Sequence, residues 1–103
     1  MRISIDKQKK IKENILALLY SKSPQPVFTA DIASELARDE EFTKKLLLEM
    51  EKERLILSVK KNNQGINYIR RIRWRLTTNV FEAYDRIEKQ KLNYNEKNNT
   101  YSF

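Results

Sequence analysis

The sequence contains no cysteine and no histidine, and it has only one glycine, Gly65, and two prolines among its 103 residues. Without cysteine no disulfide forms, and without Cys and His together the usual zinc sites and Cys/His nucleophile arrangements are absent. A chain with one glycine has no phosphate-cradling glycine loop and little means of bringing its backbone close to a ligand. We therefore expect neither an enzyme nor a bound metal or cofactor, although carboxylates holding Mg²⁺ in a nuclease stay an open alternative.

The sequence also lacks long apolar runs. No stretch approaches the length of a membrane span, and the first residues, MRISIDKQKKIKEN, are not an apolar signal core. We expect an intracellular, cytoplasmic protein without a membrane partner. The length suits one small domain. Because its end, NYNEKNNTYSF, shows no apolar period, we expect a domain over residues 1–92 and a flexible tail over 93–103.

Positive charge is in excess and is unevenly distributed. The chain has 21 Lys and Arg against 14 Asp and Glu, which gives a net charge of +7 and favours a polyanionic partner such as nucleic acid or an anionic membrane. Residues 58–81 include no acidic side chain. They supply most of the net charge through Lys60, Lys61, Arg70, Arg71, Arg73 and Arg75.

Apolar residues at helical spacing predict three helices in the first half of the chain. The first helix carries Ile11, Ile15, Leu18 and Leu19. Both prolines then predict a stiff connector, followed by a short helix with Thr29 as its N-cap, which ends near Ala37. A third helix begins near Asp39 or Glu40, where acidic side chains suit the helix dipole. The second helix buries Ile32, Ala33 and Leu36, and the third buries Phe42, Leu46, Leu47 and Met50.

Two strand-like runs, RLILSVKK and INYIRRIRWRLT, flank the polar loop NNQG and predict a β-hairpin. A fourth helix follows, capped by Thr77 or Thr78. Strand alternation puts Ile72, Trp74 and Leu76 on one face and the arginines at 71, 73 and 75 on the other. Arginines at this spacing match successive phosphates of one nucleic-acid strand, and the alternative is a solvated face where their stems cover apolar surface.

The order of these elements resembles the winged helix-turn-helix family of DNA-binding domains over roughly residues 8 to 88. The resemblance rests on TADIASELA as the helix before the turn, on KLLLEMEKERLI as the recognition helix entering the first wing strand, and on WRLTTNVFEAY as the returning strand and last helix. It implies an α+β winged helix with a three-helix core, a two-stranded wing and an additional C-terminal helix. It also implies that the third helix enters the major groove of double-stranded DNA while the wing lies along the backbone or reaches the minor groove.

The face of the third helix opposite its buried stripe is then the candidate reading surface. Lys44 and Lys45 would reach phosphates or guanine edges, and Leu48 a thymine methyl group, unless these residues form an ordinary solvated face or contact a protein. At the hairpin tip Asn63 and Gln64 suit groove-floor contacts and equally suit any polar turn.

The fourth helix carries an apolar stripe of Val80, Phe81, Tyr84 and Ile87. Regulators of the winged helix-turn-helix family, which this sequence resembles, are often two-fold dimers joined by terminal helices. We therefore expect this stripe to form a homodimer interface. The alternative is that the fourth helix folds back against the first and completes the monomer core.

We therefore predict a double-stranded DNA-binding transcription regulator. The main rival is a winged helix used as a protein interaction module in a larger complex. RNA binding is a third hypothesis, which the lack of an exposed aromatic row on the wing disfavours.

Overall fold

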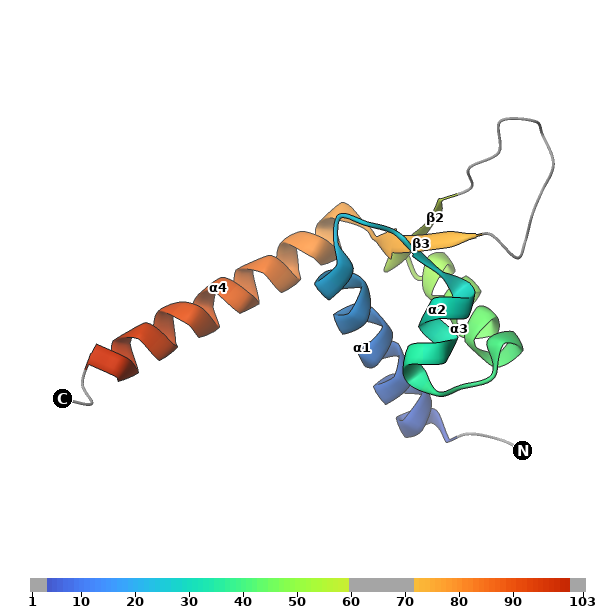
Figure 1. Ribbon diagram of the computed structural model, residues 1–103, viewed down its shortest axis with the longest axis horizontal. Coiled ribbons are helices and arrows are strands. Elements are labelled where there is room, and N and C mark those ends of the chain that lie inside the picture. The colour runs from blue at the N-terminus through green and yellow to red at the C-terminus, as the bar shows by residue number, and fades with distance from the viewer. Residues whose placement is uncertain (1–3, 60–71, 101–103) are drawn as a thin grey trace.

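The computed structural model describes residues 4–59 and 72–100, which form four helices and a three-stranded sheet (Figure 1). Their order along the chain is α1 (Ile5–Lys22), β1 (Val27–Phe28), α2 (Thr29–Leu36), α3 (Glu40–Lys52), β2 (Ile56–Val59), β3 (Arg73–Leu76) and α4 (Thr78–Thr100).

Local chemistry sets most helix ends. The Ser4 hydroxyl accepts from the Lys7 N–H (3.2 Å) at the start of α1, and the Asp39 carboxylate accepts from the Phe42 N–H (3.1 Å) at the start of α3. The start of α3 at Glu40 agrees with the start predicted near Asp39 or Glu40. With so little glycine in the chain, ordinary residues take the left-handed conformation after α2 and α3: Ala37 has φ 52° and Arg54 has φ 62°.

The start of α2 differs from the sequence prediction. Phe28 occupies the N-cap position without a capping side chain, and Thr29, predicted as the N-cap, is the first helical residue. The Thr29 hydroxyl is engaged elsewhere, since it accepts from the Trp74 indole N–H (2.8 Å) and donates to the Ile72 carbonyl (3.3 Å). The prediction of Thr29 as a cap is therefore wrong, because its hydroxyl oxygen accepts from Trp74 of β3 and not from the backbone of α2.

The sheet has the order β1-β3-β2, with both neighbours antiparallel to the central strand. The β2–β3 pair is the predicted one, in the register Ser58 opposite Trp74. The connector predicted after α1 is wrong for its last two residues: Val27 and Phe28 pair with Trp74 and Arg73 and add a third strand. A two-residue strand is too short to show alternation, so no period in the sequence reveals it.

The core lies between the sheet and the three N-terminal helices and closes on Trp74, which is fully buried. The predicted stripes are confirmed at their centres, while Leu18, Leu36 and Phe42 are only partly buried at the core margin. Thr43 is buried instead, and its hydroxyl donates to the Asp39 carbonyl (2.8 Å). The buried apolar residues are Ile11, Ile15, Leu19, Ile32, Ala33, Leu46, Leu47, Met50, Ile56, Trp74 and Leu76.

Helix α4 leaves the sheet and projects away from the body of the molecule (Figure 1). It begins after Thr77, whose hydroxyl donates to the carbonyl oxygens of Arg54 (3.1 Å) and Leu55 (3.3 Å) and so ties the helix start to the end of α3. Its backbone stays helical to Thr100, past the domain end expected at residue 92. The boundary and the flexibility of the tail remain predictions.

Candidate nucleic-acid interface

The exposed face of α3 is the first part of the candidate site. Leu48 is 41% exposed, Lys45 is exposed and Lys44 is half-buried, because all three lie opposite the buried Thr43, Leu46, Leu47 and Met50. Together with Glu41 and Phe42 they line a shallow hollow of about 450 Å³. An apolar floor between two lysines can receive an anionic ligand that also has apolar surface.

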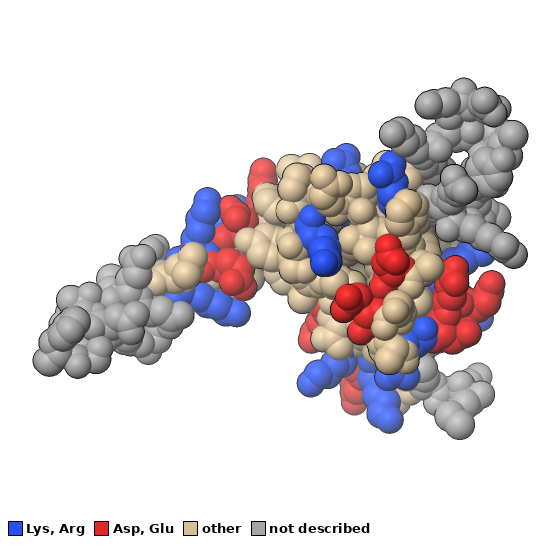
Figure 2. All heavy atoms as spheres, viewed as in Figure 1, with Lys and Arg blue, Asp and Glu red and all other residues tan. Residues whose placement is uncertain are grey.

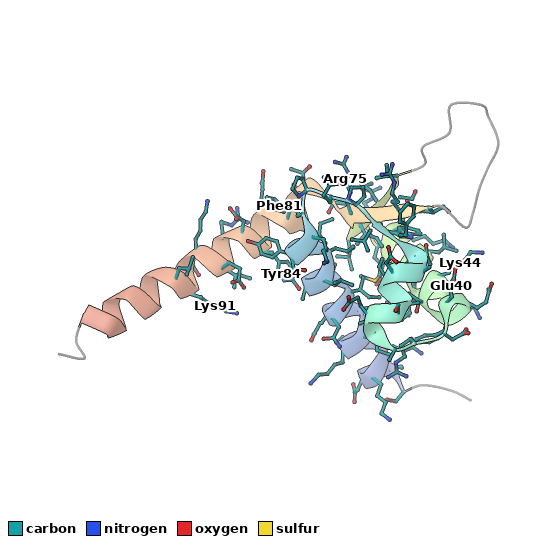
Figure 3. All side chains as sticks on the ribbon, viewed as in Figure 1. Glu40, Lys44, Arg75, Phe81, Tyr84 and Lys91 are labelled. Atoms are coloured by element: carbon teal, nitrogen blue, oxygen red, sulfur yellow. The ribbon has the colours of Figure 1, made fainter. Side chains whose placement is uncertain are left out.

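Charge on this face changes along the helix. Asp39, Glu40 and Glu41 gather at the start of α3, where they complement the helix dipole. Figure 3 shows Glu40 and Lys44 on the same stretch of α3, at the side of the molecule away from α4. Neither Lys44 nor Lys45 forms an ion pair with another residue in the part of the chain that the structure describes. These two ammonium groups are therefore available to an anion.

Contacts with α1 and β2 fix the orientation of α3. The Lys12 ammonium lies 3.0 Å from Glu53 and 3.5 Å from Glu49; its partial burial opposes the charge, but the two carboxylates outweigh this and raise the pKa of Lys12. The Glu51 carboxylate accepts from both the N–H (2.9 Å) and the hydroxyl (2.6 Å) of Ser58. Helix α3 is thus held against two other elements.

Strand β3 carries the second part of the candidate site. Trp74 and Leu76 are buried, Arg75 is exposed and Arg73 is half-buried, so the predicted alternation of apolar and arginine faces is confirmed for these residues. The Arg73 guanidinium lies over the Phe28 ring, 5.8 Å from its centroid. Sequence reasoning missed Phe28, because only the pairing of β1 with β3 brings this ring beside an arginine.

Arg75 of β3 and Lys44 of α3 lie on separate parts of the surface. Figure 3 labels Arg75 beside the start of α4 and Lys44 on α3, well separated across the body of the molecule. In Figure 2, lysine and arginine atoms appear in several separate groups on the visible face, with acidic atoms between some of them. The remaining predicted contacts lie outside the residues that the structure describes, namely Lys60, Lys61, Asn63, Gln64, Arg70 and Arg71.

The residues predicted for a dimer interface lie mostly against α1. Val80 and Phe81 pack on the core, and the rings of Phe81 and Tyr84 lie 5.6 Å and 5.5 Å from the Tyr20 ring. Tyr20 also donates to the Asp85 carboxylate (3.2 Å), and partial burial together with this carboxylate raises the pKa of Tyr20. Ile87, by contrast, is 49% exposed. Three of the four residues thus contact the body of the molecule. The alternative of a helix packed on α1 through Tyr84 and Ile87 is met by Tyr84 but not by Ile87.

None of the helices in residues 4–59 and 72–100 is long and apolar enough to cross a membrane. Within the same residues, no group of three or more Asp or Glu side chains is placed to hold a metal ion.

Helices α2 and α3, followed by the antiparallel β2–β3 pair and packed under α1, make this chain an α+β winged helix, which confirms the predicted fold. Solved structures share it. A mutant of ZitR from Lactococcus lactis is 25% identical with a TM-score of 0.58, and the match covers 99% of this chain and 68% of that one.

Two structures of MepR are also similar. MepR, a transcription regulator of the Staphylococcus aureus multidrug efflux pump MepA, is 25% identical with a TM-score of 0.56, and the match covers 87% of this chain and 69% of that one. A MepR mutant bound to an oligodeoxyribonucleotide is 23% identical with a TM-score of 0.57, over 87% and 69% of the two chains. No protein-family model matches the chain, and no curated protein sequence is significantly similar.

Proposed function

We propose that this chain is an intracellular transcription regulator that binds double-stranded DNA. The observation that carries the proposal is the fold itself, which is shared with MepR, a transcription regulator, one mutant of which has been solved with an oligodeoxyribonucleotide. The net charge of +7 supports a polyanionic partner.

In this proposal α3 enters the major groove. Lys44 and Lys45 contact phosphates or guanine edges, and Leu48 meets a thymine methyl group, a contact for which its exposed side chain is suited. Glu41, on the same face, disfavours phosphate and accepts from the amino group of cytosine instead.

The hairpin between β2 and β3 supplies backbone contacts in the same proposal. Six basic side chains, predicted from the sequence, neutralise phosphates, while Asn63 and Gln64 reach the groove floor. Arg73 and Arg75 belong to this set by prediction from the sequence. Arg75 lies away from Lys44 (Figure 3), so its contact with the same duplex needs its own test. The backbone set is Lys60, Lys61, Arg70, Arg71, Arg73 and Arg75.

Selection from a random duplex pool, followed by gel shifts across a salt series, tests the proposal. We expect an enriched motif, duplex preferred over single strand, and affinity that falls with salt by about 0.9 log units per log unit of salt for each phosphate neutralised. Lys44→Ala, Lys45→Ala or Leu48→Ala should each change base preference, at about 1 to 3 kcal/mol per specific contact.

Lys91→Ala is the matched control for the two lysine substitutions, because it removes the same charge from an exposed site on α4, far from Lys44 (Figure 3). Base preference that is unchanged in all three α3 variants would rule out reading by this helix.

A protein interaction module is the second candidate, and the hollow lined by Phe42 and Leu48 on α3 favours it. If selection returns no motif and duplex and single strand bind alike, this candidate replaces the first.

We further propose that the regulator is a homodimer joined through α4. Ile87 and Leu92 support this, because they are 49% and 61% exposed on α4, the helix that projects from the body (Figure 1). A two-fold pair would place two α3 helices on a palindromic site.

A further inference from the structure

The side of the sheet turned away from the core carries a second, distinct set of side chains. It consists of residues from all three strands, which we call the outer sheet face: Phe28, Leu57 and Arg75, which are exposed, and Val59 and Arg73, which are half-buried. The register puts Phe28 and Val59 on either side of Arg73, and Leu57 opposite Arg75. The alternate residues Ile56, Trp74 and Leu76 are buried on the other side.

The outer sheet face combines apolar surface with unpaired positive charge. Phe28 is 41% exposed and Leu57 is 40% exposed. None of the five residues is acidic, and neither Arg73 nor Arg75 forms an ion pair within residues 4–59 and 72–100. A ligand that covers this face must therefore bring both anionic groups and apolar groups.

This requirement distinguishes between classes of ligand. A duplex backbone brings phosphates but nothing to cover Leu57 and Val59. Single-stranded nucleic acid binds by stacking bases on aromatic rings, but this face has one ring, over which the Arg73 guanidinium already lies at 5.8 Å. Carboxylates suit the arginines as bidentate partners, and aliphatic side chains suit Leu57 and Val59. A peptide that carries both satisfies the whole face.

We propose that the outer sheet face docks a segment of a partner protein in which acidic and apolar residues alternate. Segments of this composition are typically disordered and fold onto a complementary surface, and clusters of arginine are a recurrent means of recognising acidic motifs. The surface does not include Lys44, which lies elsewhere on the molecule (Figure 3), so the inference does not depend on DNA binding by α3. It does give Arg73 and Arg75 a ligand other than the phosphates of the proposed backbone set.

The direct test is fluorescence anisotropy with a labelled synthetic peptide of alternating Glu and Leu. Two matched peptides separate the contributions, one with Gln in place of Glu and one with Ser in place of Leu, and oligo-dT serves as a nucleic-acid probe. We expect the Glu/Leu peptide to bind, and each matched peptide to bind about tenfold more weakly or worse, the loss expected when charge-assisted contacts or apolar contacts are removed.

Variants locate the binding. Arg75→Glu and Leu57→Ser should each weaken the Glu/Leu peptide about tenfold or more, since one removes an anion partner and the other an apolar contact. Lys91→Glu makes the same charge reversal on α4 and should leave peptide binding unchanged. Circular dichroism and thermal melting establish that each variant is folded. Arg75→Gln replaces Arg75→Glu if the charge reversal prevents folding.

Four results would overturn the proposal, three with the peptide and oligo-dT probes and one with duplex DNA. One is the absence of peptide binding at millimolar concentration. Another is equal binding of the Ser-containing peptide, which would reduce the effect to charge alone. A third is that oligo-dT binds as tightly as the Glu/Leu peptide and loses affinity in Leu57→Ser. In duplex gel shifts, a flatter salt slope for the Arg73→Ala, Arg75→Ala double variant with unchanged peptide binding would assign these arginines to phosphate instead.

Discussion

The hydrogen bond between Trp74 and Thr29 joins residues 45 positions apart inside the core. Thr29→Val keeps the volume but removes the acceptor and leaves a buried indole N–H without a partner. We expect a loss of about 1 to 3 kcal/mol in the free energy of unfolding, measured by urea denaturation. Thr29→Ser, which keeps the hydroxyl, is the control. A loss of the same size when Thr29→Val is made in a Trp74→Phe background would show that the bond is not its cause.

The same pair shows the limit of residue-level prediction. Trp74 was placed correctly on the buried face, because alternation along one strand is a local pattern. Thr29 was assigned as a cap, because threonine before an apolar helix is also a local pattern. Its role is decided by the Trp74 indole on β3. The spacing of residues within TADIASELA contains no information about that partner.

At the scale of elements, the junction between α1 and α4 combines the ring contacts of Tyr20 with one carboxylate, that of Asp85. Asp85 lies 3.0 Å from Lys89 and accepts from Tyr20, and the hydrogen bond from Lys89, helped by that from Tyr20, lowers the pKa of Asp85 below 3.8. Because folding lowers the pKa of Asp85, its ionised carboxylate stabilises the folded state above pH 3.8. This stabilisation is lost as the pH falls through the pKa that Asp85 has in the folded state.

We therefore expect Asp85→Asn to melt at a lower temperature than the wild type at neutral pH, with the difference shrinking as pH falls below 3.8. Thermal melts followed by circular dichroism over a pH series measure this difference. Glu82→Gln, at an exposed carboxylate of the same helix, is the control. A difference between Asp85→Asn and the wild type that does not change with pH would mean that the ionised carboxylate does not stabilise the junction.

Element-level prediction succeeded where an element was long enough to show its period. The four helices and the β2–β3 pair were predicted, and the exposed face of α3 followed from its buried stripe. Strand β1 was not predicted, and with it the outer sheet face was missed. Phe28 next to the prolines has no apolar neighbour at regular spacing, so only the assembled sheet reveals its position opposite Arg73.

At the scale of the whole molecule, oligomeric state is the first question. Light scattering at micromolar concentration should give about twice the 12.4 kDa of one chain. Ile87→Glu combined with Leu92→Glu should return it to a monomer, because both residues are exposed on α4 and neither change should disturb the Tyr84–Tyr20 stacking. Leu48→Glu makes the same chemical change on α3 and should leave the mass unchanged. A mass near that of one chain for the wild type would contradict the dimer.

The position of β3 has a consequence for biosynthesis. Although β3 is the last strand to be synthesised, it lies in the middle of the sheet, and β1 and β2 pair with it rather than with each other. A nascent chain that has emerged only as far as Val59 contains the residues of α1, α2, α3, β1 and β2. It lacks the central strand with which β1 and β2 pair. Ile15, Ile32 and Leu47 then lack the Trp74 side of their core, so the domain closes only after Leu76 has left the ribosome.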